Sequence, residues 1–284
     1  MSNPINHHYV SQCQIRNFFN KEAGKIFLYD KIQHNHFNST STKKIFSERH
    51  LNSRSKDGII DTFSLEADLN SSVESSFTKN FNILLEAVTT EIIPPDIKNV
   101  VIGLLKYGIA GEIRTPKHKK DTDESIKNAF DILLDNAIPE QKQSLDGAFA
   151  NLRLTPYSNL LEYSDFVETV FESIGDINFI LYVINSDQFF LLPDRPSLTR
   201  RERINDHYNP DAKEIAVVQV PLSSKMFLHC ESVKFRKFKS RFVELSDLNQ
   251  TVIDDINKNL YFNANQLVAC ENEQYLTSLI KKFN

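Results

Sequence analysis

Apolar side chains recur every three or four positions along much of the first half of the chain. In the longest such stretch they run from Leu65 to Val88, which places them on one face of a helix. Pro94-Pro95 ends this helix, because proline lacks an amide proton and its ring clashes with the preceding turn. The same spacing predicts three further helices, over residues 97–105, 126–134 and 160–171.

The pattern changes in the second half, where nearly continuous apolar runs separated by polar turns replace the helical spacing. Such runs predict two β-hairpins. The first pairs residues 178–184 with residues 189–192, and the second pairs residues 215–220 with residues 226–230. Residues 234–243 predict a further strand.

The two ends of the chain complete the pattern. Residues 7–19 predict a short helix or turn, and residues 25–30 a strand. Residues 34–57 predict a long polar surface loop that could include a small strand near Ile45-Phe46. From Asp247 the helical spacing returns and continues to a final short helix that begins near Tyr275.

This order of elements predicts the α+β class, with a helical first half, a mostly antiparallel sheet in the second half, and C-terminal helices that cover the sheet. A length of 284 residues is enough for one large domain or two modest ones. No clear linker divides the chain, so we expect a single α+β domain over residues 1–284.

Composition narrows the classes of function. Hydrophobic residues make up 40% of the chain and charged residues 25%, as in ordinary globular proteins, which excludes a collagenous, mucin-like or wholly disordered chain. A net charge of -4 gives no general attraction to nucleic acid or to anionic membranes. Only seven glycines are present, which excludes the glycine arrays of dinucleotide-binding and P-loop folds.

Cysteine usage and targeting signals suggest a location. Cys13, Cys230 and Cys270 form no CxxC pair and cannot build a disulfide framework, so a reducing compartment is the natural setting. The N-terminus has no basic patch followed by an apolar run. The apolar run over residues 179–184 is far shorter than the roughly 20 residues that span a bilayer. We therefore expect a cytoplasmic protein with no membrane partner.

Several separated segments carry a family resemblance. They are His7-His8-Tyr9-Val10-Ser11-Gln12, Arg114-Thr115-Pro116, Phe189-Phe190-Leu191-Leu192-Pro193-Asp194-Arg195-Pro196, Pro221-Leu222 and the predicted helix from Asn257 to Ala264. In this order they resemble the bacterial domain-of-unknown-function family 4238, whose members open with a His-His-x-Val-Pro-Gln motif. The resemblance covers nearly the whole chain, and it implies an order of elements without an assigned reaction.

The chain departs from the family pattern at two positions. Ser11 stands where the family usually has proline, and Pro193 stands where it has serine. The resemblance therefore implies no serine chemistry at position 193.

The adjacent histidines are the first candidates for chemistry. In an extended segment the side chains of His7 and His8 point to opposite sides, so at most one of them faces a given site. A neutral imidazole can act as a base or a metal ligand near pH 7. The alternative is a histidine that is hydrogen-bonded in the core or simply exposed.

A carboxylate and a guanidinium are the next candidates. Asp194 lies between Pro193 and Pro196, which stiffen the backbone, so its carboxylate could hold a metal or orient an imidazole. The alternative is a turn aspartate bonded to its own backbone. The guanidinium of Arg114 suits a phosphate or a carboxylate, whereas the basic residues 117–120 also fit a solvated loop.

The segment from Lys234 to Phe242 combines basic and aromatic residues. Lys234, Arg236 and Lys237 can neutralise phosphates while the aromatic faces stack on bases. The same pattern is typical of an edge strand whose lysines prevent aggregation. Both interpretations stay open.

We therefore hypothesise a phosphodiester-directed hydrolase, nuclease-like, in a bacterial toxin or phage-defence setting. His7 or His8 is the expected base or metal ligand, Asp194 the metal-binding or orienting carboxylate, and Arg114 the phosphate clamp. Gln12 joins the substrate-binding residues through its place in the first motif. The cofactor is unknown, although a divalent metal is compatible with these residues, and the expected partner is nucleic acid.

Two other hypotheses remain. The chain could be a non-enzymatic module that uses residues 234–242 to hold nucleic acid or an acidic protein partner without turnover. Alternatively, His7, Arg114 and Asp194 form only a buried structural network. Convergence of an imidazole, the guanidinium and the carboxylate in one pocket would favour a catalytic site.

Overall fold

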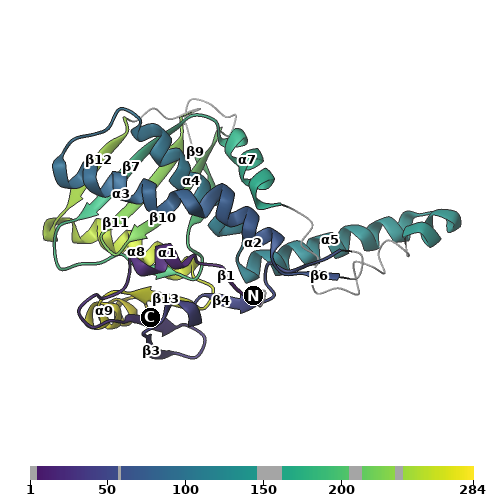
Figure 1. Ribbon diagram of the computed structural model, residues 1–284, viewed down its shortest axis with the longest axis horizontal. Helices are drawn as coiled ribbons and strands as arrows, with labels where there is room; N and C mark the ends of the chain where they lie inside the picture. The colour runs from purple at the N-terminus through teal and green to yellow at the C-terminus, as the bar shows by residue number, and fades with distance from the viewer. Residues whose placement is uncertain (1–4, 57–58, 146–161, 205–212, 234–238) are drawn as a thin grey trace.

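The computed structural model describes residues 5–56, 59–145, 162–204, 213–233 and 239–284. Two sheets lie side by side in the body of the molecule, and the helices of the first half cover the larger one (Figure 1). The α+β class is confirmed, with a largely helical first half, antiparallel strands in the second half and two C-terminal helices.

The larger sheet has five strands in the order β12-β7-β11-β10-β9. The strands are β7 (Ile177–Ile184), β9 (Leu198–Ile204), β10 (Lys213–Ser223), β11 (Met226–Ser232) and β12 (Arg241–Leu245). All neighbours are antiparallel except β12 and β7, which are parallel. The hairpin expected from residues 215–230 is confirmed as β10 and β11.

The hairpin expected from residues 178–192 is wrong. Strand β7 pairs with β11 and β12 of the larger sheet, whereas Leu192–Pro193 form β8 of the smaller sheet. A continuous apolar run predicts a buried strand but does not say which strand pairs with it. Two successive strands pair as a hairpin only if the turn between them keeps both in one sheet. Here the backbone amide of Phe190 bonds to the carbonyl of Ser224, and the chain leaves the larger sheet at this point.

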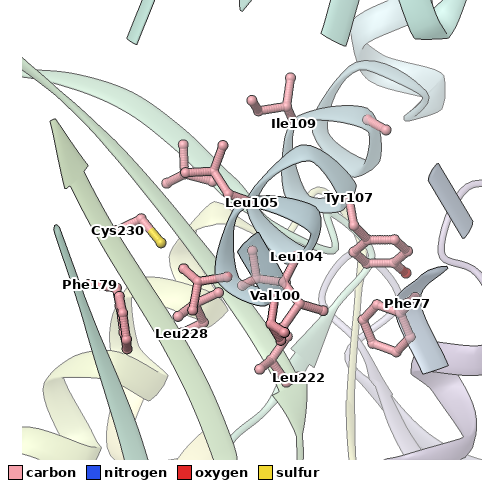
Figure 2. Packing of buried hydrophobic residues seen from close by; sticks show 14 of the residues in the cluster. Phe77, Val100, Leu104, Leu105, Tyr107, Ile109, Phe179, Leu222, Leu228 and Cys230 are labelled. Carbon is pink, nitrogen blue, oxygen red and sulfur yellow. The ribbon is translucent and has the colours of Figure 1, made fainter. Parts of the chain in front are cut away.

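Three helices cover one face of the larger sheet: α3 (Ser75–Thr90), α4 (Ile97–Ile113) and α7 (Tyr163–Ile174). Leu104 and Leu105 of α4 lie beside Leu228 and Cys230 of β11 (Figure 2). On the α3 side of α4, the ring of Tyr107 lies 4.3 Å from that of Phe77. The helical spacing of the sequence thus corresponds to the faces that form the main core.

The smaller sheet joins distant parts of the chain. It has the order β3-β2-β13-β8, with β2 (Ile26–Asp30), β3 (Asn35–Ser39), β8 (Leu192–Pro193) and β13 (Leu267–Cys270). Helices α8 (Gln250–Asn263) and α9 (Glu273–Phe283) pack with it in a second apolar cluster, which also includes Ile184 and Phe227 of the larger sheet. The C-terminal helices therefore cover the junction between the two sheets.

The N-terminal region contains more structure than its polar sequence predicts. The elements are β1 (Asn6–His8), α1 (Gln12–Arg16), the 3-10 turn η1 (Thr42–Lys44), β4 (Ser47–Arg49), β5 (Arg54–Lys56), β6 (Ile59–Asp61), α2 (Ser64–Leu69) and the π-helical turn η2 (Asn70–Glu74). The loop expected over residues 34–57 thus holds short strands, of which β4 pairs with β1 and β3 with β2. Strand β4 forms by pairing with β1, about 40 residues earlier, whereas β3 forms a local hairpin with β2 although its side chains are polar and mostly exposed. The first pairing is not reported by local propensity, and the second lacks the apolar alternation that predicts a strand.

Helix α5 (Pro116–Asn136) begins directly after α4 and points away from the two sheets (Figure 1). The stretch from Arg114 to Lys120, expected to separate two helices, is instead the C-cap of α4 and the first turn of α5. The hydroxyl of Thr115 caps α5 by accepting a hydrogen bond from the amide of His118, at 3.3 Å. Pro116 is the first residue of the helix, where an amide would have no partner within the helix, so its missing amide proton costs no hydrogen bond. No helix among the described residues is long and apolar enough to cross a membrane.

Gly108 allows α4 to lie close to β10, because a Cβ built there would come within 2.5 Å of Val220 Cγ2. We expect Gly108→Ala to lower the free energy of unfolding by about 1–3 kcal/mol through overpacking. Gly103→Ala in the same helix is the matched control, since its Cβ meets only the flexible side-chain amide of Asn80. Alanine should leave stability there unchanged or raise it by up to about 1 kcal/mol. Urea denaturation measures both, and equal effects would show that close packing at Gly108 is not the cause.

Candidate functional site

Strand β1 places the two histidines against different loops. The buried Nδ1 of His7 accepts a hydrogen bond from the backbone amide of Asn52 at 2.8 Å. The half-buried His8 donates from Nε2 to the carbonyl of Thr42 at 3.1 Å. Gln12 is tied to the same loop as His8, because its Oε1 accepts from Thr42 Oγ1 at 2.9 Å. The first motif therefore spans two loops rather than directing both imidazoles into one cavity.

Burial lowers the pKa of His8, and the positive charge of Arg114 adds to this effect. The Thr42 carbonyl and the carboxylates of Glu66 and Glu74 act in the opposite direction. The net lowering means that His8 is neutral at pH 7.

Arg114 is buried at the C-cap of α4. Its Nε donates to the Tyr9 carbonyl at 2.9 Å, and its Nη1 forms an ion pair with Glu74 at the end of η2. Burial opposes the charged form, but Glu74 and its neighbours outweigh it and raise the pKa of Arg114. The Nη2 atom has no hydrogen-bond partner among the described residues.

A hydrogen-bonded set connects these residues to α2 and α7. The Asn52 side chain donates to Glu66 Oε1 at 2.6 Å and accepts from the hydroxyl of Tyr163 at 2.7 Å. We call this group the N-terminal polar cluster; its members are His7, His8, Asn52, Glu66, Glu74, Arg114 and Tyr163. The structure thus brings the predicted histidines and Arg114 together.

Asp194 lies outside the N-terminal polar cluster. Its Oδ1 accepts from the amide of Asn265 at 2.7 Å, and its Oδ2 accepts from the amides of Gln266 and Leu267 at 2.7 and 3.0 Å. Burial raises the pKa of Asp194, and the three amide donors oppose that rise. Both oxygens of the carboxylate are therefore occupied in fixing the backbone of residues 265–267.

An open pocket of about 100 Å³ lies where the second and third motif segments meet. Pro196 is so close to Gly111 of α4 that a Cβ on the glycine would come within 2.9 Å of its ring. Arg195 forms an ion pair with Glu112, and its Nε donates to Glu112 Oε1 at 2.5 Å. We call this cavity the α5 pocket. Its lining residues are Glu112, Thr115, Lys117, His118, Asp121, Arg195 and Asn265.

The charges of the α5 pocket are mixed. Lys117, which is 60% exposed, donates to Asp121 at 2.8 Å, and both lie on the first turns of α5. Burial lowers the pKa of His118, although Glu112 and Asp121 act in the opposite direction. The lining of the pocket therefore includes an imidazole that is neutral at pH 7, an ammonium and a guanidinium.

Sequence analysis placed His118 in a basic loop and Arg195 within a motif, but it gave neither a role in a site. Their meeting depends on the contact between α4 and the segment after β8, which no local spacing reports. The predicted binding residues Lys234, Arg236 and Lys237 lie outside the described residues. Within the described ranges, no group of three or more His, Cys, Asp or Glu side chains is placed to hold a metal ion.

Comparison with known families bears on the three motif segments together. The family model described as "Protein of unknown function (DUF4238)" matches residues 6–274. The chain belongs to this family. The match runs from β1 into α9 of this DUF4238 protein and so includes both the N-terminal polar cluster and the α5 pocket. No curated protein and no solved structure matches the chain.

Asp194→Asn should weaken the fold, because the new amide nitrogen cannot accept a bond from a backbone N–H. We expect the free energy of unfolding to fall by about 2–3 kcal/mol, the range for hydrogen bonds to a charged group. The exposed Asp187→Asn is the control and should stay within about 0.5 kcal/mol of the unchanged protein. Equal denaturation midpoints for the two variants would contradict a structural role for Asp194.

Proposed function

We propose that this protein is a phosphodiester-directed hydrolase, nuclease-like, that binds a substrate phosphate in the α5 pocket. The observation that carries the proposal is the meeting of His118, Lys117 and Arg195 in one open cavity. The cavity lies between two of the segments through which the chain resembles its family, and it combines groups for binding a phosphate with a group for moving a proton.

Phosphate binding follows from the positions of the positive charges. The ammonium of Lys117 and the guanidinium of Arg195 line the pocket from different elements, so both can reach one phosphate. The positive end of the α5 helix dipole also favours an anion here. Glu112 holds Arg195 by its ion pair and thereby fixes the direction of the guanidinium.

His118 is the group that moves the proton. As a neutral imidazole it takes a proton from an attacking water while the water oxygen bonds to phosphorus. The bond from phosphorus to the leaving oxygen then breaks, and the protonated His118 returns its proton to that oxygen. Lys117 and Arg195 balance the negative charge that grows on the phosphate oxygens in between.

The expected phosphate clamp, Arg114, and the expected catalytic carboxylate, Asp194, have positioning roles in this proposal. Arg114 ties the end of α4 to Tyr9 and Glu74, and so fixes the point where α5 begins. Asp194 fixes the backbone at Asn265, which lines the pocket. The roles of His7 and His8 as base or metal ligand, and the toxin or phage-defence setting, stay predictions.

A second candidate function is nucleic-acid binding without turnover through residues 234–242. The observation in its favour is the exposure of Lys239 and Arg241 beside the edge strand β12. The ring of Phe242 in β12 packs against the ring of Phe179, with centroids 6.3 Å apart, and is therefore not available to stack on a base. This candidate predicts binding that weakens steeply with salt, and no cleavage.

Cleavage of labelled RNA and DNA, with and without divalent metals, tests the proposal. We expect His118→Gln to lower the cleavage rate by about 100-fold or more, the usual contribution of a general acid-base group. Lys117→Gln should weaken substrate binding and reduce its salt dependence. Lys120→Gln is the matched control, since Lys120 is on the same helix, is 76% exposed and does not line the pocket. Full activity of His118→Gln, or salt-dependent binding with no cleavage by the unchanged protein, would contradict the proposal.

The pH profile gives an independent test. Because burial holds the pKa of His118 below its usual 6.5, the imidazole is neutral at pH 7 and becomes protonated only in more acid solution. A base that must be neutral predicts a kcat/KM that is constant above pH 6.5 and falls on acidification below it. A profile that rises on acidification would show that another group takes the proton.

A further inference from the structure

A second pocket, of about 130 Å³, lies between α1 and α3. Cys13, Arg16 and Asn17 line it from α1 and its C-cap, and Phe77 and Phe81 line it from α3. We call it the Cys13 pocket. It shares no residue with the α5 pocket or with the N-terminal polar cluster, so nothing in the proposed hydrolysis uses it.

The α3 side of the Cys13 pocket is an aromatic wall. The rings of Phe77 and Phe81 are stacked, parallel to within 5° and with their centroids 6.3 Å apart. Phe77 is 1% exposed and also packs against the ring of Tyr107, with centroids 4.3 Å apart, so the partly buried Phe81 provides most of the accessible part of the wall. The hydroxyl of Tyr107 bonds to Ser11 and Gln14, which ties the wall to α1. An aromatic wall favours an aromatic ring as the ligand, because the edges and faces of aromatic rings attract one another.

The α1 side of the pocket carries a positive charge. Arg16 is exposed in the last turn of α1, and no hydrogen bond or ion pair involves it within the described part of the chain. Asn17 donates its side-chain amide to the Leu222 carbonyl at 2.9 Å, which keeps the polar end of α1 in place. Polar side chains of Thr78 and Asn82 lie at the opposite rim. A guanidinium beside an aromatic wall suits an anion on the ring, and a carboxylate matches its two donors.

The volume limits the ligand to one ring. Cavities of about 150 Å³ hold a benzene-sized molecule, and this pocket is slightly smaller but open to solvent on one side. We propose that the Cys13 pocket binds a single-ring aromatic carboxylate, with its ring against Phe77 and Phe81 and its carboxylate on Arg16.

Cys13 provides a direct report of occupancy. Cys230 and Cys270 are 1% and 0% exposed, whereas Cys13 is only partly buried and lines the pocket. N-ethylmaleimide should therefore alkylate Cys13 in the native protein. Burial raises the pKa of the Cys13 thiol, so a mildly alkaline solution is needed to obtain enough thiolate.

The experiment measures the rate of Cys13 alkylation by intact-protein mass spectrometry with increasing benzoate. We expect saturable protection by benzoate, and at least about tenfold weaker protection by cyclohexanecarboxylate, which lacks the flat ring, and by benzyl alcohol, which lacks the charge. Arg16→Gln should weaken protection by benzoate about tenfold. Arg49→Gln, a change of an exposed arginine on β4, is the matched control and should leave protection unchanged.

Three results would overturn the proposal. The first is no protection by benzoate at concentrations where it is soluble. The second is equal protection by cyclohexanecarboxylate, which would show that the wall does not select an aromatic ring. The third is full protection by benzoate in Arg16→Gln, which would show that the carboxylate does not lie on Arg16. None of these readouts depends on cleavage of nucleic acid, so they leave the proposed hydrolysis untouched.

Discussion

The close contact between α4 and β10 is the constraint on which the rest of this structure depends. At Gly108 the helix backbone lies against Val220, and the hydroxyl of Ser197 donates to the Gly108 carbonyl. This contact fixes the position of the α4 side chains that lie on either side of it. Tyr107 bonds to Gln14 of α1 and packs against Phe77, which lines the Cys13 pocket, while Glu112 and Arg114 lie at the end that leads into α5. A small displacement of the helix would therefore change both pockets and the N-terminal polar cluster together.

The N-terminal polar cluster shows how costly groups are kept inside the protein. A buried guanidinium is tolerated only when its charge and most of its donors are matched. Glu74 matches the charge of Arg114 and the Tyr9 carbonyl accepts from its Nε, whereas Nη2 has no hydrogen-bond partner among the described residues. The carboxylate of Glu66 accepts from the side chain of Asn52. Replacing one member leaves its buried partners without a hydrogen bond or a compensating charge, so the effects of substitutions in the cluster are not independent.

The sequence predicted the elements better than their partners. Helices such as α3, α4 and α8 follow from the spacing of apolar residues, because each buries one face against a sheet. Strand β1 was missed because it is held by pairing with the distant β4, and β3 was missed because its polar residues lack apolar alternation. The small strand expected near Ile45-Phe46 lies two residues later, as β4. The motifs drew attention to Arg114 and Asp194, neither of which lines the α5 pocket. Their contacts with Glu74 and with the amides of 265–267 depend on tertiary packing. His118 and Arg195 meet for the same reason.

The composition of the smaller sheet has a consequence for how the chain acquires its structure during synthesis. Strand β2 is made about 240 positions before its neighbour β13, so β2 lacks one flank until β13 has also been made. Pairings over such separations form slowly, because a very long loop must close first. Until then β2, whose side chains are all buried in the finished protein, offers an apolar edge to other chains. The strand of this sheet that is synthesised first therefore waits longest for its second neighbour.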